Sequence, residues 1–226
     1  MRCSVLLLAP ATALMQFRAP LVADGYAAKT AGDALLVYLP GFDGANLAPF
    51  LQWPALHDAG FDVRCASIDE SDRSTFDELV TAASDYIDRE ACDRPCLLVG
   101  ESFGGALATV VAQQASNVEG VVLVNPATCY AESALASKAP PILELPAWAY
   151  YVGLASLLPL FVDRHGVRAL FDIVTNKRLP CVIETPRQEA YMGRVALSLP
   201  ERIARMPRGT LAWRLREWLD VGAKVD

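Results

Sequence analysis

The chain has 226 residues, a formal net charge of −6 and 53% apolar residues. Its length fits one domain, or one domain with an insertion, and its composition excludes a disordered or fibrous chain. The acidic balance argues against general nucleic-acid binding, which needs clustered Lys and Arg. Only two histidines are present, His57 and His165, so a mechanism that needs an imidazole must use one of them, or the chain lacks its base.

Residues 1–25 have the composition of a targeting segment. One cation, Arg2, precedes a short apolar run, and no acidic residue appears before Asp24. This pattern is typical of a signal-like or organelle transit sequence. A buried first strand preceded by a short tail is the alternative. We therefore set residues 1–25 apart from the fold prediction.

Residues 26–127 alternate short apolar runs with helical segments. Residues 34–39 form a continuous apolar run that predicts a central strand buried on both faces. A helix is predicted over 46–57, with a break at Pro54 as the alternative, and a strand over 61–68. Further on, Ser74 is expected to cap a helix, strands are expected at 96–99 and 118–124, and a helix at 106–114. This order predicts an α/β fold with a mostly parallel sheet.

The second half of the chain has a different pattern. Residues 128–205 are rich in Pro, Ala, Leu and aromatics, and they are interpreted as a helical lid insertion. Within them, residues 145–162 carry no charge, but Pro146, Gly153 and Pro159 favour a buried or surface-docked helix over a membrane span. Residues 206–226 return to the core, with an amphipathic helix expected over 209–221.

The six cysteines are irregularly spaced, which favours reduced thiols in an intracellular compartment over a disulfide framework. No zinc pattern is formed, so neither a metal nor a cofactor is expected.

The sequence Gly100-Glu101-Ser102-Phe103-Gly104-Gly105 matches Gly-x-Ser-x-Gly and lies between an apolar strand and a helix. This is the context of a nucleophile elbow, in which glycines let the strand and the helix approach and the serine is held exposed. The pattern predicts Ser102 as a catalytic nucleophile, and a glycine-rich turn with a solvated serine is the alternative. Glu101 is expected to shape the pocket or to form a salt bridge.

The loop after the strand at 34–39 carries a second motif, Pro40-Gly41-Phe42-Asp43-Gly44. In this architecture the loop supplies one N–H of the oxyanion hole, and the residue after the nucleophile supplies the other. We therefore expect the Phe42 and Phe103 amides to be the donors, with Gly41 giving the loop its freedom. A simple turn at the strand end is the alternative, and Asp43 is expected to stabilise that turn.

These motifs resemble those of α/β-hydrolases, and more narrowly those of the plant and algal phytyl ester synthase and diacylglycerol acyltransferase-like esterases. The residues that carry the resemblance are Leu-Pro-Gly-Phe-Asp-Gly, Leu-Val-Gly-Glu-Ser-Phe-Gly-Gly, Leu-Val-Asn-Pro-Ala-Thr and the helix around Leu211 to Leu215. The resemblance implies an α/β-hydrolase fold, a plastid location and acyl transfer to phytol or diacylglycerol. It also places the acid and the histidine of the triad after late strands, which puts both beyond residue 226 and leaves the last strands missing.

Two functional hypotheses follow. In the first, Ser102 carries out acyl transfer or hydrolysis on lipid-like carboxylic esters, and the apolar lid makes peripheral contact with a membrane. His165 is then a less favoured candidate for the base, since it lies in the insertion with no strand before it. In the second, the chain is a catalytically incompetent fragment that binds lipid or a partner. A sheet without its late strands would expose an edge. Neither the acyl acceptor nor the oligomeric state can be deduced from the sequence.

Overall fold

The computed structural model describes residues 15–22, 26–28, 33–46, 49–50, 52–157, 186, 190 and 206–220. Predictions that concern residues 1–14, His165 and most of the second half of the lid insertion lie outside these residues.

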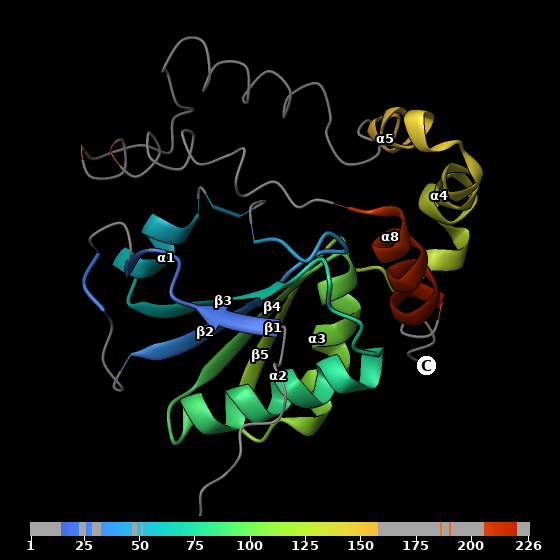
Figure 1. Cartoon of the computed structure of the whole chain (residues 1–226). Helices are drawn as coiled ribbons and strands as arrows, with labels where there is room; N and C mark the ends of the chain where they lie inside the picture. The colour runs from blue at the N-terminus through green and yellow to red at the C-terminus, as the bar shows by residue number, and fades with distance from the viewer. Residues whose placement is uncertain are drawn as a thin grey trace, which may run out of the picture.

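The fold is built on a five-stranded sheet in the order β1-β3-β2-β4-β5 (Figure 1). β3, β2, β4 and β5 are mutually parallel along this order, and β1 pairs antiparallel with β3. The predicted α/β class with a mostly parallel sheet is confirmed. The strands are β1 (Met15–Arg18), β2 (Ala34–Leu39), β3 (Phe61–Ile68), β4 (Cys96–Glu101) and β5 (Val118–Val124).

β1 lies inside the segment that the sequence interpretation had set aside. Its register places Met15 opposite Ile68 and Arg18 opposite Cys65. Phe17 stacks on Tyr86 with a centroid distance of 3.8 Å and an interplanar angle of 7°. Pairing with a buried strand therefore orders four residues whose composition had suggested a targeting sequence.

β2 is the central strand, and both of its faces are covered. Leu35, Val37 and Leu39 face the core formed with α2 (Phe76–Ala91) and α3 (Phe103–Gln114). Leu36 and Tyr38 belong to a separate apolar cluster. That cluster contains Trp53 of α1 (Trp53–Asp58) on the opposite face (Figure 1). Alternation along an extended strand explains the two clusters, and the predicted two-sided burial is confirmed.

Three helix starts differ from the sequence prediction. α1 begins at Trp53 rather than 46, because Pro54 occupies the first turn, where it starts a helix instead of breaking it. α2 is capped by Thr75 and not by Ser74. α3 begins at Phe103, directly after the Ser102 turn, and not at 106.

The helices of the second half stack beside the carboxyl ends of the strands (Figure 1). The Tyr150 hydroxyl of α5 donates to the Met206 carbonyl at 2.7 Å, and Arg208 donates to the Leu145 carbonyl. No helix among the described residues is long and apolar enough to cross a membrane. These helices are α4 (Ala134–Glu144), α5 (Ala147–Ala155), α8 (Arg208–Arg214) and the π-helical turn η4 (Leu215–Asp220).

β5 is the exposed edge of the described sheet. Four consecutive apolar side chains, Val121 to Val124, are each 40–44% exposed. Because the exposure does not alternate along the strand, neither face of β5 is fully covered here. Among the described residues, β5 therefore ends the sheet with apolar side chains partly exposed.

Candidate functional site

Ser102 occupies a sharp turn between β4 and α3. Its φ of 52° and ψ of −118° place a non-glycine residue in a sparsely populated region. Three backbone hydrogen bonds hold it there. The Ser102 N–H donates to Val124 O at 2.9 Å, and the Ser102 carbonyl accepts from Gly105 at 2.9 Å and from Ala127 at 2.8 Å. The strained turn is therefore fixed by β5 and by the first turn of α3.

Close approach of backbone explains the glycines around Ser102. A Cβ on Gly100 would lie 2.3 Å from the Gly104 carbonyl oxygen, and one on Gly104 would lie 2.2 Å from the Leu39 carbonyl oxygen. A Cβ on Gly105 would lie 2.7 Å from Pro126 Cβ. All three contacts are shorter than any normal van der Waals distance. The Gly-x-Ser-x-Gly spacing is thus what allows β4, α3 and β2 to pack this closely.

The loop after β2 lies directly beside Ser102. A Cβ built on Gly41 would be 3.6 Å from Ser102 Cβ, an ordinary contact, so no crowding requires glycine there. The freedom expected at Gly41 is needed instead at Gly44, whose φ is +73°. The loop closes through a bond of 2.9 Å from the Gly44 N–H to Gly41 O, and Ile68 N–H binds Gly44 O at 2.9 Å.

The two expected oxyanion donors lie in these segments. Phe103 is the first residue of α3, where a backbone N–H has no acceptor within the helix. Phe42 lies in the turn beside Ser102, and its half-buried ring packs edge-on to Trp218 at 6.5 Å. The structure thus places the segments that carry both expected donors next to Ser102 in the sequence or in space.

Acidic groups line the same region. The Tyr38 hydroxyl donates to the Glu101 carboxylate, and burial together with this bond raises the pKa of Tyr38. Asp43 is exposed as a residue, but desolvation of its carboxyl raises its pKa, and the negative charge of Glu101 adds to this effect. The Asp43 carboxylate accepts from the Ala45 N–H at 3.2 Å, which is the turn-stabilising role expected from the sequence.

The described residues bring no imidazole to Ser102. His57 Nε2 contacts the Ala27 carbonyl at 2.9 Å, and its ring lies edge-on to Tyr26 at 5.2 Å. His165 lies outside the described residues. Within the described part of the chain, the Ser102 hydroxyl forms no hydrogen bond, and no cluster of three or more His, Cys, Asp or Glu side chains is placed to hold a metal.

Arg214 and Trp218 belong to this site but were not predicted from the sequence. Both are fully buried, and both contact the loop after β2 or the residue after Ser102. The available signal was Arg214 between the apolar residues Trp213 and Leu215 in the helix expected over 209–221. In the sequence it looked like an ordinary charged position on an amphipathic helix.

Comparison with known proteins is consistent with this geometry. A model of the alpha/beta hydrolase family matches residues 6–225. Two curated relatives come from Arabidopsis thaliana. Phytyl ester synthase 1, chloroplastic, is 31% identical over 186 residues, and phytyl ester synthase 2, chloroplastic, is 38% identical over 105 residues. The matches cover 80% and 45% of this chain, but only 26% and 15% of the relatives' length.

Solved structures share the fold at low identity. The alpha/beta hydrolase MGS-M2, from a deep-sea metagenome library, has a TM-score of 0.52 at 12% identity, with 91% of this chain and 68% of that chain covered. The esterase EaEST from Exiguobacterium antarcticum has a TM-score of 0.51 at 12% identity, with 81% and 68% covered. A probable hydrolytic enzyme from Pseudomonas aeruginosa has a TM-score of 0.50 at 18% identity, with 93% and 62% covered.

Proposed function

Because the chain belongs to the alpha/beta hydrolase family, we propose that it transfers or hydrolyses acyl groups of lipid-like carboxylic esters with Ser102 as the nucleophile. The observation that carries the proposal is the strained turn at Ser102, with the Gly41 loop beside its side chain and the Phe103 N–H at the start of α3. Strain of this kind persists only where surrounding structure enforces it, and it is concentrated at functional sites.

In the proposed reaction, Ser102 Oγ attacks the ester carbonyl and loses its proton to a base. The carbonyl oxygen becomes an oxyanion that accepts hydrogen bonds from the Phe42 and Phe103 N–H groups. Collapse of this intermediate releases the alcohol, which takes up the proton, and leaves an acyl-serine. Water or a second alcohol then attacks the acyl-serine and regenerates the hydroxyl. The base is proposed to be a histidine, and it is not one of the described side chains.

A fluorophosphonate probe tests the nucleophile, because it reacts with an activated serine and leaves a stable adduct. We expect the wild-type chain to be labelled and Ser102→Ala to remain unlabelled. Ser84→Ala is the matched control, because Ser84 is buried in α2 and its hydroxyl has no partner in the described structure. Absence of labelling in the wild-type chain, or labelling that survives in Ser102→Ala, would refute the proposal and favour the incompetent-fragment hypothesis.

His165→Gln extends the same experiment to the base. If His165 serves Ser102, the labelling rate falls by orders of magnitude, whereas an unchanged rate removes this residue from the mechanism. A catalytic serine without its triad partners still keeps roughly 10³–10⁴-fold of acceleration in some enzymes, so rates and not endpoints must be compared.

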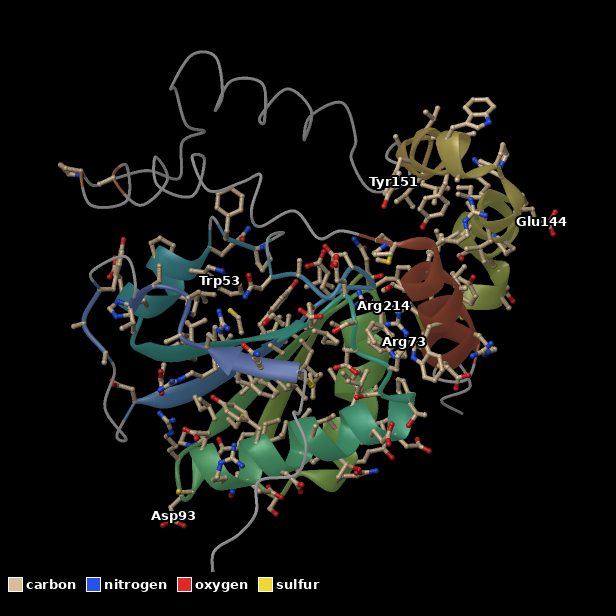
Figure 2. All side chains as sticks on the ribbon, viewed as in Figure 1. Trp53, Arg73, Asp93, Glu144, Tyr151 and Arg214 are labelled. Atoms are coloured by element: carbon tan, nitrogen blue, oxygen red, sulfur yellow. The ribbon has the colours of Figure 1, made fainter. Side chains whose placement is uncertain are left out.

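The apolar substrate class is supported by the exposed face of α5. Trp148, Tyr151 and Val152 are 83%, 62% and 71% exposed and recur at the spacing of one helical face (Figure 2 labels Tyr151). Trp and Tyr favour the membrane–water interface, and Lys138 and Glu144 are the only charged residues of α4 and α5. We therefore propose that this face contacts an uncharged lipid surface. The wild-type chain should sediment with phosphatidylcholine vesicles, and Trp148→Ser should stay in the supernatant. Equal binding of both chains to the vesicles would contradict the contact.

A plastid location is proposed on two grounds: the composition of residues 1–25 and the chloroplastic names of the two Arabidopsis relatives. Import of the radiolabelled full chain into isolated chloroplasts would support this location. Exclusion of the chain from chloroplasts under conditions that import a control precursor would contradict it.

A further inference from the structure

A fully buried guanidinium bridges two loops beside the candidate site. Arg214, at the end of α8, donates through Nη1 to the carbonyls of Phe42 at 3.0 Å and Asp43 at 2.7 Å. Through Nη2 it donates to Ile68 O at 3.2 Å and Asp69 O at 2.9 Å. Figure 2 shows Arg214 at the side of α8 that faces the sheet. One side chain thus ties the loop after β2 to the end of β3.

These contacts hold the two peptide units that directly follow the one carrying the Phe42 N–H. The guanidinium is a planar, rigid fork, so two carbonyls bound to one Nη are held in defined directions. The bound carbonyls belong to the two peptide units that follow Phe42, and this restricts rotation on the carboxyl side of that residue. Gly44 allows the close approach, because a Cβ there would lie 3.0 Å from Arg214 Nη1 and 2.6 Å from Ile68 O.

Trp218 connects the same guanidinium to the residue after Ser102. Arg214 Cζ lies 4.4 Å from the centre of the Trp218 ring, within range of a cation–π interaction. The Trp218 ring stacks on Phe103 at 4.7 Å with an interplanar angle of 14°, and it meets Phe42 edge-on. The Arg214–Trp218 pair therefore contacts both residues whose N–H groups are the proposed oxyanion donors.

Simple core filling does not account for Arg214. Burial lowers the pKa of its guanidinium to about 10, yet the group remains charged at neutral pH. Within the described structure it hydrogen-bonds to carbonyls and to no carboxylate, and its Nε is unpaired. Burying a charge in this way is costly, and an apolar side chain would fill the same space without that cost.

We propose that Arg214, supported by Trp218, is a positioning residue that holds the loop after β2 on the carboxyl side of Phe42, so that the Phe42 N–H keeps the orientation needed to bind the oxyanion. The inference rests on the proposed function, since it concerns the oxyanion hole of the same site. Arg214 itself touches no reacting atom, and it acts only through the loop after β2.

Hydrogen exchange measured on the intact chain tests whether Arg214 holds this loop. Arg214→Lys keeps the charge but loses the fork, so we expect amide exchange over residues 41–45 to become at least about tenfold faster. Arg73→Lys is the matched control, because Arg73 binds Glu70 O, Asp72 O and the Thr210 hydroxyl of α8 without touching the loop after β2. Unchanged exchange in Arg214→Lys, or an equal rise in Arg73→Lys, would overturn the proposal. If Arg214→Lys does not fold, Trp218→Phe must show a smaller rise in the same segment.

Kinetics test whether that position matters for the reaction. The oxyanion forms only in the transition state, so Arg214→Lys should lower kcat for a p-nitrophenyl ester about 10–100-fold with little change in KM. Arg73→Lys should stay within about twofold of wild type. A rise in KM at constant kcat would contradict the positioning role. If the wild-type chain shows no activity and no Ser102 labelling, the proposed function fails, while the exchange experiment still decides whether Arg214 holds the loop.

Discussion

At the scale of single residues, the candidate site requires glycine wherever a Cβ atom would clash with neighbouring backbone. The space between β2 and the first turn of α3 excludes a Cβ at Gly104, where the nearest atom is a backbone carbonyl that cannot rotate away. Gly41, two positions after Leu39 in the sequence, has ordinary clearance for a methyl group. Two glycines of adjacent motifs therefore have different physical reasons for being glycine.

Gly104→Ala should consequently destabilise the fold strongly. Overpacking costs typically 1–3 kcal/mol, and a clash with fixed backbone places the expected loss at about 3 kcal/mol. Gly41→Ala should cost less than about 1 kcal/mol, because its new methyl group meets only normal contacts. Urea unfolding followed by circular dichroism compares the two variants, and equal losses would show that crowding is not what distinguishes them.

At the scale of elements, apolar runs predicted the strands well because burial on two faces leaves a continuous signal. β2, β3 and β5 have the bounds expected from the sequence. Helix starts were less predictable because they depend on which of several hydrogen bonds is made. Ser74 and Thr75 each have an acidic residue three positions later, but the longer Glu78 side chain is the one that completes a capping box, with Thr75.

The capping box gives a pH-dependent prediction. Hydrogen bonds from the backbone N–H and hydroxyl of Thr75 lower the pKa of Glu78. A carboxyl whose pKa is lowered by folding stabilises the folded state above its unfolded pKa, and it loses this contribution as the pH falls through the folded value. Thr75→Ala should therefore destabilise the fold at pH 7, because it removes the hydroxyl that bonds to the Glu78 carboxylate and N–H, and it should do so less below about pH 4.

Thr81→Ala is the control for this measurement. Thr81 lies in the same helix, and its hydroxyl donates to the Asp77 carbonyl, so it takes no part in the cap. Thermal unfolding at pH 7 and at pH 3.5 should show a difference between wild type and Thr75→Ala that shrinks on acidification. A difference independent of pH would mean that the bond from the Thr75 hydroxyl to the Glu78 carboxylate adds nothing to the cap.

At the scale of the whole molecule, the described sheet has one apolar edge. An exposed strand presents unpaired N–H and C=O groups that template pairing with another chain. The edge strand β5 also exposes four consecutive apolar side chains, Val121 to Val124. We expect the chain to self-associate with increasing concentration and Val122→Lys to suppress this. Val22→Lys is matched in exposure, 47% against 43%, but it lies outside any strand. Sedimentation velocity should separate the two, and equal behaviour would exclude β5 as the contact.

The contacts between residues far apart in the sequence were the part of the candidate site that could not be predicted. Ser102 and its glycines are local, so a short motif between a strand and a helix was enough to find them. Arg214 reaches the loop after β2 from the end of α8, and no periodicity links positions 42 and 214. The local sequence pattern therefore predicted the candidate nucleophile, Ser102, but it could not predict that Arg214 binds the loop beside it.

That contact spans 172 positions in the chain, between Phe42 and Arg214. During synthesis the loop beside Ser102 leaves the ribosome early, while the guanidinium that fixes it emerges more than 170 residues later. β2, β3 and β4 can pair before then, since their partners lie closer in sequence. The loop after β2 is consequently among the last parts of the fold to be completed, and a nascent chain with a finished central sheet would still lack the guanidinium that ties this loop to the end of β3.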